Sequence, residues 1–143
     1  RSSDLCYSQL RETRSNDARV LIVDNIGLLS SLYAWGDVAW VGGGFARGGI
    51  HNTLEPAIFG LPVVMGPVYQ KFVEAVALVA AGCAFPVADE QMAAEVLKAL
   101  TQNDQHRNAI AAKMKEFMAN HTGAAERICT QIANAGWLAS HNT

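Results

Sequence analysis

The sequence has few cysteines and few basic residues, and both shortages narrow the classes of protein to consider. Its cysteines, Cys6, Cys83 and Cys129, are odd in number, far apart and not at the spacings of metal ligands. This favours a reducing compartment, with the thiols packed as small hydrophobes. Eleven Lys and Arg stand against thirteen Asp and Glu, for a net charge of -2. Without a basic stripe, nucleic acid is disfavoured as a partner, and any phosphate that is bound belongs to a small molecule.

Several other signals are missing. No apolar run reaches the roughly 20 residues that a membrane-spanning helix needs. No Ser-His-Asp order, CxxC pair or HExxH motif occurs, so a metal centre, a bound cofactor or a nucleophilic hydrolase has no support. The opening RSSDLCYSQL is not a secretory signal and begins with Arg1 rather than Met. We interpret the chain as a fragment of a longer protein.

What is present is an alternation of apolar runs and helical patterns in a chain long enough for one compact domain. The run RVLIVD at residues 19–24 is typical of a strand buried on both faces of a parallel sheet. The remaining strands are expected at 5–10 (a weak signal), 38–41, 62–65 and 84–87, and helices at 28–35, 53–59 and 71–81. The alternation predicts an α/β fold, a Rossmann-like doubly wound parallel sheet that binds ligands beyond the carboxyl ends of its strands.

After Asp89 the sequence becomes Ala-rich, with apolar residues at helical spacing. Two or three helices are therefore expected to close the chain. Asp89 and Asp104 are the candidate N-caps, because an Asp oxygen accepts the amide hydrogens of a first helical turn.

The segment GGGFARGG at residues 42–49 holds five glycines in eight positions, directly after a predicted strand. Such a density needs a reason, such as positive φ angles or the close approach of a ligand. Exposed amides together with the helix that begins near Asn52 predict an anion site. The alternative is an ordinary flexible surface turn.

Asn52 and Glu55 have the spacing of a capping box, in which Asn52 caps a helix and Glu55 reaches back to the cap amide. The functional alternative is that Glu55 accepts hydrogen bonds from the two hydroxyls of a ribose. His51, Arg47 and Lys71 are candidate phosphate contacts, and each can equally be a solvated polar residue of a loop.

Taken together, these motifs resemble the Kdo transferases, glycosyltransferases of the GT-B fold that add the acidic sugar Kdo from CMP-Kdo to a lipid A precursor. The resemblance covers about residues 20–87. It rests on Asp24 with Gly27 in DNIGLLSSLY, on the pair Gly42 and Gly43, on the segment GIHNTLEPA and on GPVYQKF.

The resemblance implies that this chain is the C-terminal, sugar-nucleotide-binding half of such an enzyme, a single domain over residues 1–143 that is inactive alone. The catalytic base and the acceptor domain would lie in an absent N-terminal half. The implied CMP-Kdo site consists of Asn25, Ile26, Gly27, Gly42, Gly43, Gly44, Arg47, His51, Asn52, Glu55 and Lys71. The sequence departs from the family at three positions, where Asn25, Leu28 and Lys71 replace a Thr, a Glu and an Asn.

Two alternatives remain open at this point. The chain can be the donor domain of another GT-B enzyme that uses a UDP-sugar, or a non-catalytic nucleotide-binding module, since a fold alone does not choose a ligand. The family resemblance implies a full-length enzyme at the cytoplasmic face of the bacterial inner membrane, attached through the absent half, with this fragment soluble.

Overall fold

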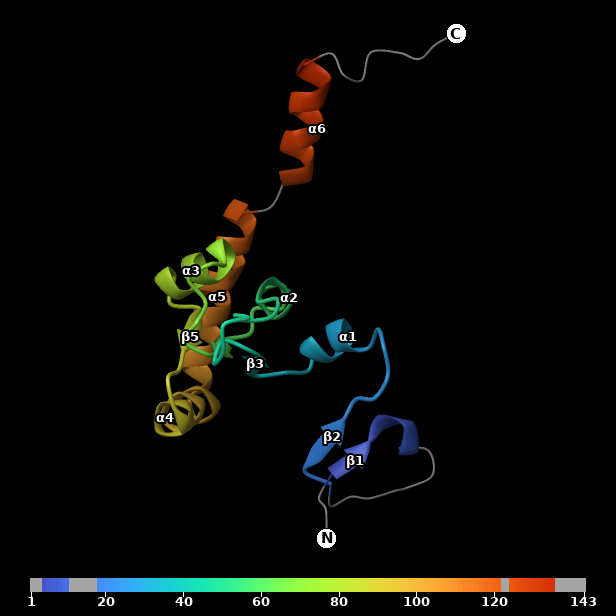
Figure 1. Ribbon diagram of the computed structural model, residues 1–143, viewed down its shortest axis with the longest axis vertical. Helices are drawn as coiled ribbons and strands as arrows, with labels where there is room; N and C mark the ends of the chain where they lie inside the picture. The colour runs from blue at the N-terminus through green and yellow to red at the C-terminus, as the bar shows by residue number, and fades with distance from the viewer. Residues whose placement is uncertain (1–3, 11–17, 122–123, 136–143) are drawn as a thin grey trace.

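The computed structural model describes residues 4–10, 18–121 and 124–135, and it confirms the α/β fold class with parallel strand pairing throughout the described sheets (Figure 1). The strands are β1 (Asp4–Cys6), β2 (Val20–Ile22), β3 (Ala39–Val41), β4 (Val63–Met65) and β5 (Ala84–Pro86). The α-helices are α1 (Leu29–Tyr33), α2 (Leu54–Ile58), α3 (Val73–Ala80), α4 (Glu90–Thr101), α5 (Asp104–His121) and α6 (Ala124–Asn134). A strand or helix of the predicted type overlaps each predicted range, but the strand expected at 5–10 ends at Cys6, where a 3-10 helix follows. The closing helices number three among the described residues.

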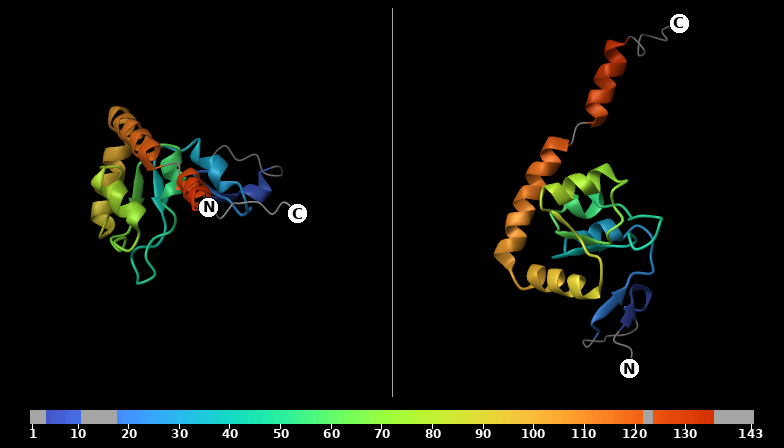
Figure 2. Two further views of the ribbon diagram at one scale, coloured as in Figure 1. Left: turned by 90° about the horizontal axis from the view of Figure 1, so that it is seen from above. Right: turned by 60° about the vertical axis from the view of Figure 1, so that its left-hand side comes forward.

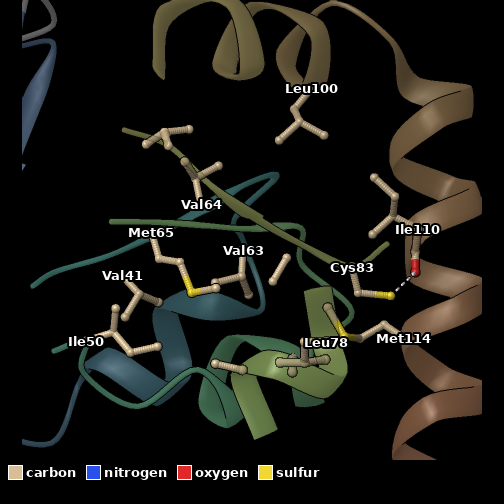
Figure 3. Close-up of a cluster of buried hydrophobic side chains, with 14 residues drawn as sticks. Val41, Ile50, Val63, Val64, Met65, Leu78, Cys83, Leu100, Ile110 and Met114 are labelled. Atoms are coloured by element: carbon tan, nitrogen blue, oxygen red, sulfur yellow. Dashed lines mark hydrogen bonds between the residues drawn. The ribbon is translucent and has the colours of Figure 1, made fainter. Parts of the chain in front are cut away.

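The core is built on the three-stranded sheet, in the order β3-β4-β5. Its central strand β4 has no exposed side chain, because Val63, Val64 and Met65 are all buried. Figure 3 shows Val64 directed toward Leu100 of α4 on one side of the sheet, and Met65 directed toward the opposite side, where Leu78 of α3 lies. A continuous apolar strand fits this place because helices cover both of its faces.

Helix α5 closes the end of this core through Ile110 and Met114, which are both buried (Figure 3). Asp89 caps α4 as expected, since its Oδ1 accepts the Met92 amide at 2.8 Å. The prediction that Asp104 caps α5 is wrong. The cap is made by Asn103, whose Oδ1 accepts the His106 amide at 2.9 Å, and Asp104 instead lies in the first turn of the helix.

Strands β1 and β2 form a separate two-stranded sheet, which lies apart from β3–β5 (Figures 1 and 2). The prediction that residues 19–24 form an interior strand is therefore wrong. Val20, Leu21 and Ile22 are 48%, 44% and 46% exposed. The apolar run correctly indicates a strand, but among the described residues only β1 pairs with it.

A short 3-10 helix (Tyr7–Gln9) follows β1 and is tied to the end of β2. The Ser8 hydroxyl donates to Asp24 Oδ2 at 2.6 Å, and the Ser8 amide donates to Oδ1 at 3.0 Å. The bond from the Ser8 hydroxyl has the larger effect and the bond from the Ser8 amide the smaller one, and both lower the pKa of the Asp24 carboxyl. Asp24 therefore holds together the carboxyl ends of two parallel strands.

The cysteines follow the expectation of buried thiols in part. Cys83 is fully buried, Cys6 is half-buried and Cys129, on α6, is exposed. Figure 1 shows α6 beyond the end of α5 and apart from both sheets, which explains why a thiol on that helix meets solvent. Over the described parts of the chain, no helix combines the length and the apolar character that crossing a membrane requires.

Candidate functional site

The glycine-rich segment after β3 is a tightly bonded loop. The Gly44 amide donates to the Gly49 carbonyl at 2.7 Å, and the His51 amide donates to the Gly42 carbonyl at 3.0 Å. Gly43 pairs with Ile50 in an antiparallel bridge. The expected positive φ angles are present at Gly43, Gly44 and Gly49. The bonded amides of Gly44 and His51 stabilise the loop itself, so they do not point to a bound anion.

This loop contacts the turn that follows β4, and glycine makes the contact possible. A Cβ on Gly44 would lie 2.9 Å from Gly66 Cα, and a Cβ on Gly66 would lie 2.7 Å from the Gly43 carbonyl oxygen. The Val68 amide also donates to the Gly44 carbonyl at 2.9 Å. The close approach that the glycines permit is therefore one between two backbone segments, at the carboxyl ends of β3 and β4.

Asn52 and Glu55 are joined at the start of α2, although not as a capping box. Asn52 Oδ1 accepts the Leu54 amide at 3.0 Å, while Asn52 Nδ2 donates to Glu55 Oε1 at 3.0 Å. The predicted bond from Glu55 to the cap amide is replaced by this bond to the side chain. Both ends of the Asn52 amide group are thus used, and one oxygen of the Glu55 carboxylate is oriented by a neighbour three residues away.

A cavity of about 440 Å³ opens where α1, the end of β3 and the start of α2 meet. This volume lies within the usual range of small-molecule sites. The cavity is lined by Leu29, Tyr33, Trp40, Val41, Gly42, His51, Asn52 and Glu55.

The structure brings four of the predicted site residues to this cavity: Gly42, His51, Asn52 and Glu55. The imidazole of His51 lies over Gly42, since a Cβ there would be 3.3 Å from His51 Cδ2. The other predicted residues do not line the cavity, and they are Asn25, Ile26, Gly27, Gly43, Gly44, Arg47 and Lys71. Of these, only Gly44 is buried or half-buried; the others are exposed.

Sequence reasoning missed two aromatic residues in the lining, Tyr33 on α1 and Trp40 on β3. The pKa of the Tyr33 phenol is raised, mainly by burial and further by the negative charge of Glu55. Tyr33 therefore stays protonated at neutral pH beside that carboxylate. Trp40 carried a usable signal, because it is the one bulky aromatic residue of a short apolar strand that ends at the glycine loop.

Thr53, between Asn52 and α2, has a fully buried side chain whose Oγ1 lacks a hydrogen-bond partner among the described residues. Thr53→Val keeps the shape and removes the unsatisfied hydroxyl, so we expect the free energy of unfolding to rise by about 1 kcal/mol. Urea denaturation followed by circular dichroism measures the change. Thr53→Ser, which keeps the hydroxyl and loses the methyl group, should be destabilising. A lower urea midpoint for Thr53→Val would contradict the assignment of an unsatisfied hydroxyl.

Within the residues that the structure describes, no three His, Cys, Asp or Glu side chains are placed to hold a metal ion.

No model of a protein family matches the chain. Curated proteins do match it over most of its length. It is 36% identical over 120 residues to the 3-deoxy-D-manno-octulosonic acid transferase of Bordetella pertussis, a match that covers 83% of this chain and 28% of that protein.

Two further transferases of the same name are similar to the chain. The protein of Chlamydia pneumoniae is 34% identical over 110 residues, covering 76% of this chain and 25% of the relative. The protein of Aquifex aeolicus is 48% identical over 52 residues, covering 36% of this chain and 15% of the relative. The chain thus spans 28% or less of the length of these three relatives.

A solved structure has a similar fold, the C-terminal CMP-Kdo binding domain of WaaA from Acinetobacter baumannii. The TM-score is 0.70 at 24% sequence identity, over 80% of this chain and 60% of that one. The sequence matches and this shared fold agree with each other. The chain belongs to the family of the 3-deoxy-D-manno-octulosonic acid transferases.

Proposed function

We propose that the chain is the donor-binding domain of a glycosyltransferase that transfers Kdo from CMP-Kdo to a lipid A precursor in lipopolysaccharide biosynthesis. The names of the relatives support the reaction, and the fold shared with a CMP-Kdo binding domain supports the donor. The cavity at the carboxyl end of β3 supports the location, because open parallel α/β sheets bind ligands at that edge.

The observation that carries this proposal is the oriented carboxylate of Glu55 in the wall of the cavity. Asn52 Nδ2 donates to Glu55 Oε1 at 3.0 Å, which fixes the rotamer of the glutamate. A carboxylate held in this way can accept two hydrogen bonds from the neighbouring hydroxyls of a ribose. We therefore assign Glu55 and Asn52 to the ribose of the nucleotide.

We propose that residues in the cavity lining and on the loops beside the cavity contact the phosphate and the sugar of the donor. His51 lies in the cavity lining, beside Gly42. Arg47 and Lys71 are exposed on the two loops that meet at Gly44 and Gly66, and the segment 25–27 lies before α1. The negative charge that develops on a departing CMP phosphate needs such donors and cations. Because Arg47 and Lys71 lie outside the lining, they can act only on a part of the donor that extends from the cavity.

The remaining parts of the reaction are assigned to residues outside this chain. Transfer to a hydroxyl group needs a base, and we propose that an N-terminal domain supplies both the base and the acceptor site, so that the fragment alone is inactive. We propose that the whole enzyme, whose acceptor would be a lipid, works at the cytoplasmic face of the inner membrane. Residues 1–143 then form one domain with a single task, which is to bind the donor.

An NMR titration of isotopically labelled chain with CMP, and separately with UMP, tests the proposed donor. We expect CMP to shift the amide resonances of residues 42–55 more strongly than UMP at equal concentration. An equal response to both nucleotides would favour a UDP-sugar donor. Absence of any response to CMP would contradict the proposed site.

Replacing Glu55 by Ala tests the ribose assignment. We expect CMP to bind about tenfold more weakly, as lost hydrogen bonds to a charged group predict, with an unchanged circular dichroism spectrum. Glu90→Ala is the matched control, because Glu90 is also an acidic residue in the first turn of a helix but lies outside the cavity. Equal CMP affinities for the two variants would contradict the role of Glu55.

A further inference from the structure

The aromatic side chain of Trp40 lines the donor cavity, but the ribose and phosphate assignments give it no contact with the ligand. Trp40 lies on β3 between Ala39 and Val41, whose side chains are buried in the core. Because side chains alternate along a strand, Trp40 points to the other face of the sheet, and it is 45% exposed. A large apolar ring that remains half-exposed inside a cavity offers binding surface to a ligand.

The ring of Trp40 also has an aromatic neighbour. It is stacked with Phe45 of the glycine loop, with ring centroids 6.3 Å apart and an angle of 7° between the ring planes. Phe45 does not line the cavity, whereas Trp40 does. Phe45 therefore packs on the indole from outside the lining, and the flat apolar indole remains part of the cavity wall.

We propose that the indole of Trp40 is the platform on which the base of the donor nucleotide stacks. The proposal rests on the donor-binding function proposed above and extends it to the nucleobase. A nucleotide whose ribose hydroxyls bind Glu55 must place its base nearby, and Trp40 and Glu55 line the same cavity. Stacking on an aromatic ring is available to every base, so Trp40 contributes affinity, and the choice between bases falls to polar groups.

Trp40→Leu tests the platform with two ligands, CMP and ribose 5-phosphate, which has no base. We expect the variant to bind CMP about tenfold more weakly, as the loss of one base–aromatic stack predicts. Its affinity for ribose 5-phosphate should stay within about twofold of the unaltered chain. NMR titration of the 143-residue chain measures both constants.

Two further variants separate stacking from a structural role. Trp40→Phe keeps an aromatic face, so it should retain most of the CMP affinity that Trp40→Leu loses. Trp35→Leu is the matched control, because Trp35 is 89% exposed and lies outside the cavity. CMP should quench tryptophan fluorescence in Trp35→Leu, and this quenching should be lost in Trp40→Phe.

The outcomes distinguish this inference from the function on which it rests. Failure of the unaltered chain to bind CMP would overturn the donor-binding proposal, and the platform with it. Normal CMP binding by Trp40→Leu, or an equal loss of CMP and ribose 5-phosphate, would overturn the platform alone. Loss of CMP binding with ribose 5-phosphate binding retained, and rescue by Trp40→Phe, would support it.

Discussion

Replacing Gly66 by alanine is expected to lower the free energy of unfolding by about 3 kcal/mol or more, one of the largest effects of any single methyl group in this chain. A Cβ at position 66 would lie 2.5 Å from the carbonyl carbon of Gly44 and 2.7 Å from the carbonyl oxygens of Gly43 and Gly44. These are backbone atoms, which cannot turn away as a side chain can. The turn after β4 must therefore separate from the glycine loop, and CMP binding should be lost with it.

Urea denaturation of Gly66→Ala followed by circular dichroism measures this loss. Gly48→Ala is the control, because a Cβ at position 48 meets no heavy atom within 4 Å and the residue has no positive φ. Its urea midpoint should match that of the unaltered chain. Equal midpoints for the two alanine variants would show that the two loops do not approach as closely as the structure has them.

Arg107→Ala is expected to cost about 2–3 kcal/mol of stability, because the guanidinium joins the end of α4 to the start of α5. Its Nη1 donates to the Leu100 carbonyl at 2.7 Å and to the Thr101 carbonyl at 3.0 Å. Its Nη2 donates to Asp104 at 2.7 Å and lies 3.4 Å from Asp37. Removing the side chain leaves the last carbonyls of α4 without this charged donor, and thermal or urea denaturation measures the result.

The expected cost comes from the carbonyl bonds rather than from the ion pairs. The carboxylate side chain of Asp37 is 74% exposed, so water and salt screen its attraction to Arg107. Asp37→Asn should therefore change the stability by no more than about 0.5 kcal/mol. A cost for Asp37→Asn as large as that for Arg107→Ala would place the stabilisation in the ion pair and contradict this account.

Sequence patterns predicted the existence of the strands better than their surroundings. The runs VLI in β2 and VVM in β4 are both continuous and apolar, and the first was expected to be an interior strand. β4 has strands on both sides and helices over both faces, so its side chains are inaccessible. β2 pairs only with β1 among the described residues. An apolar run predicts a strand that can be buried. Whether other elements cover that strand depends on contacts with residues far away in the sequence.

In the candidate site, too, local features could be predicted from the sequence, whereas features that depend on tertiary contacts could not. The contact between Asn52 and Glu55 is local, because Asn52 lies just before α2 and Glu55 lies in the first turn of that helix. Tyr33 and Trp40 come from other elements, α1 and β3, and only the tertiary structure brings them to the same cavity as α2. The glycine density at 42–49 was taken to mean positive φ angles or the close approach of a ligand. The positive φ angles are present, and the group that approaches in the structure is the backbone at Gly66, which the spacing of residues does not reveal.

The buried thiol of Cys83 can serve as a probe of local opening of the structure, because it reacts only when solvent reaches it. Its Sγ lies 3.8 Å from the Ala81 carbonyl and 4.0 Å from the Ile110 carbonyl, beneath α5, and burial raises the pKa of the thiol. An alkylating reagent reaches this buried thiol only when the packing around it opens, whereas Cys129 is exposed and needs no such opening. The labelling rate of Cys83, compared with that of Cys129, therefore measures how often the native domain opens at this position, without any denaturant.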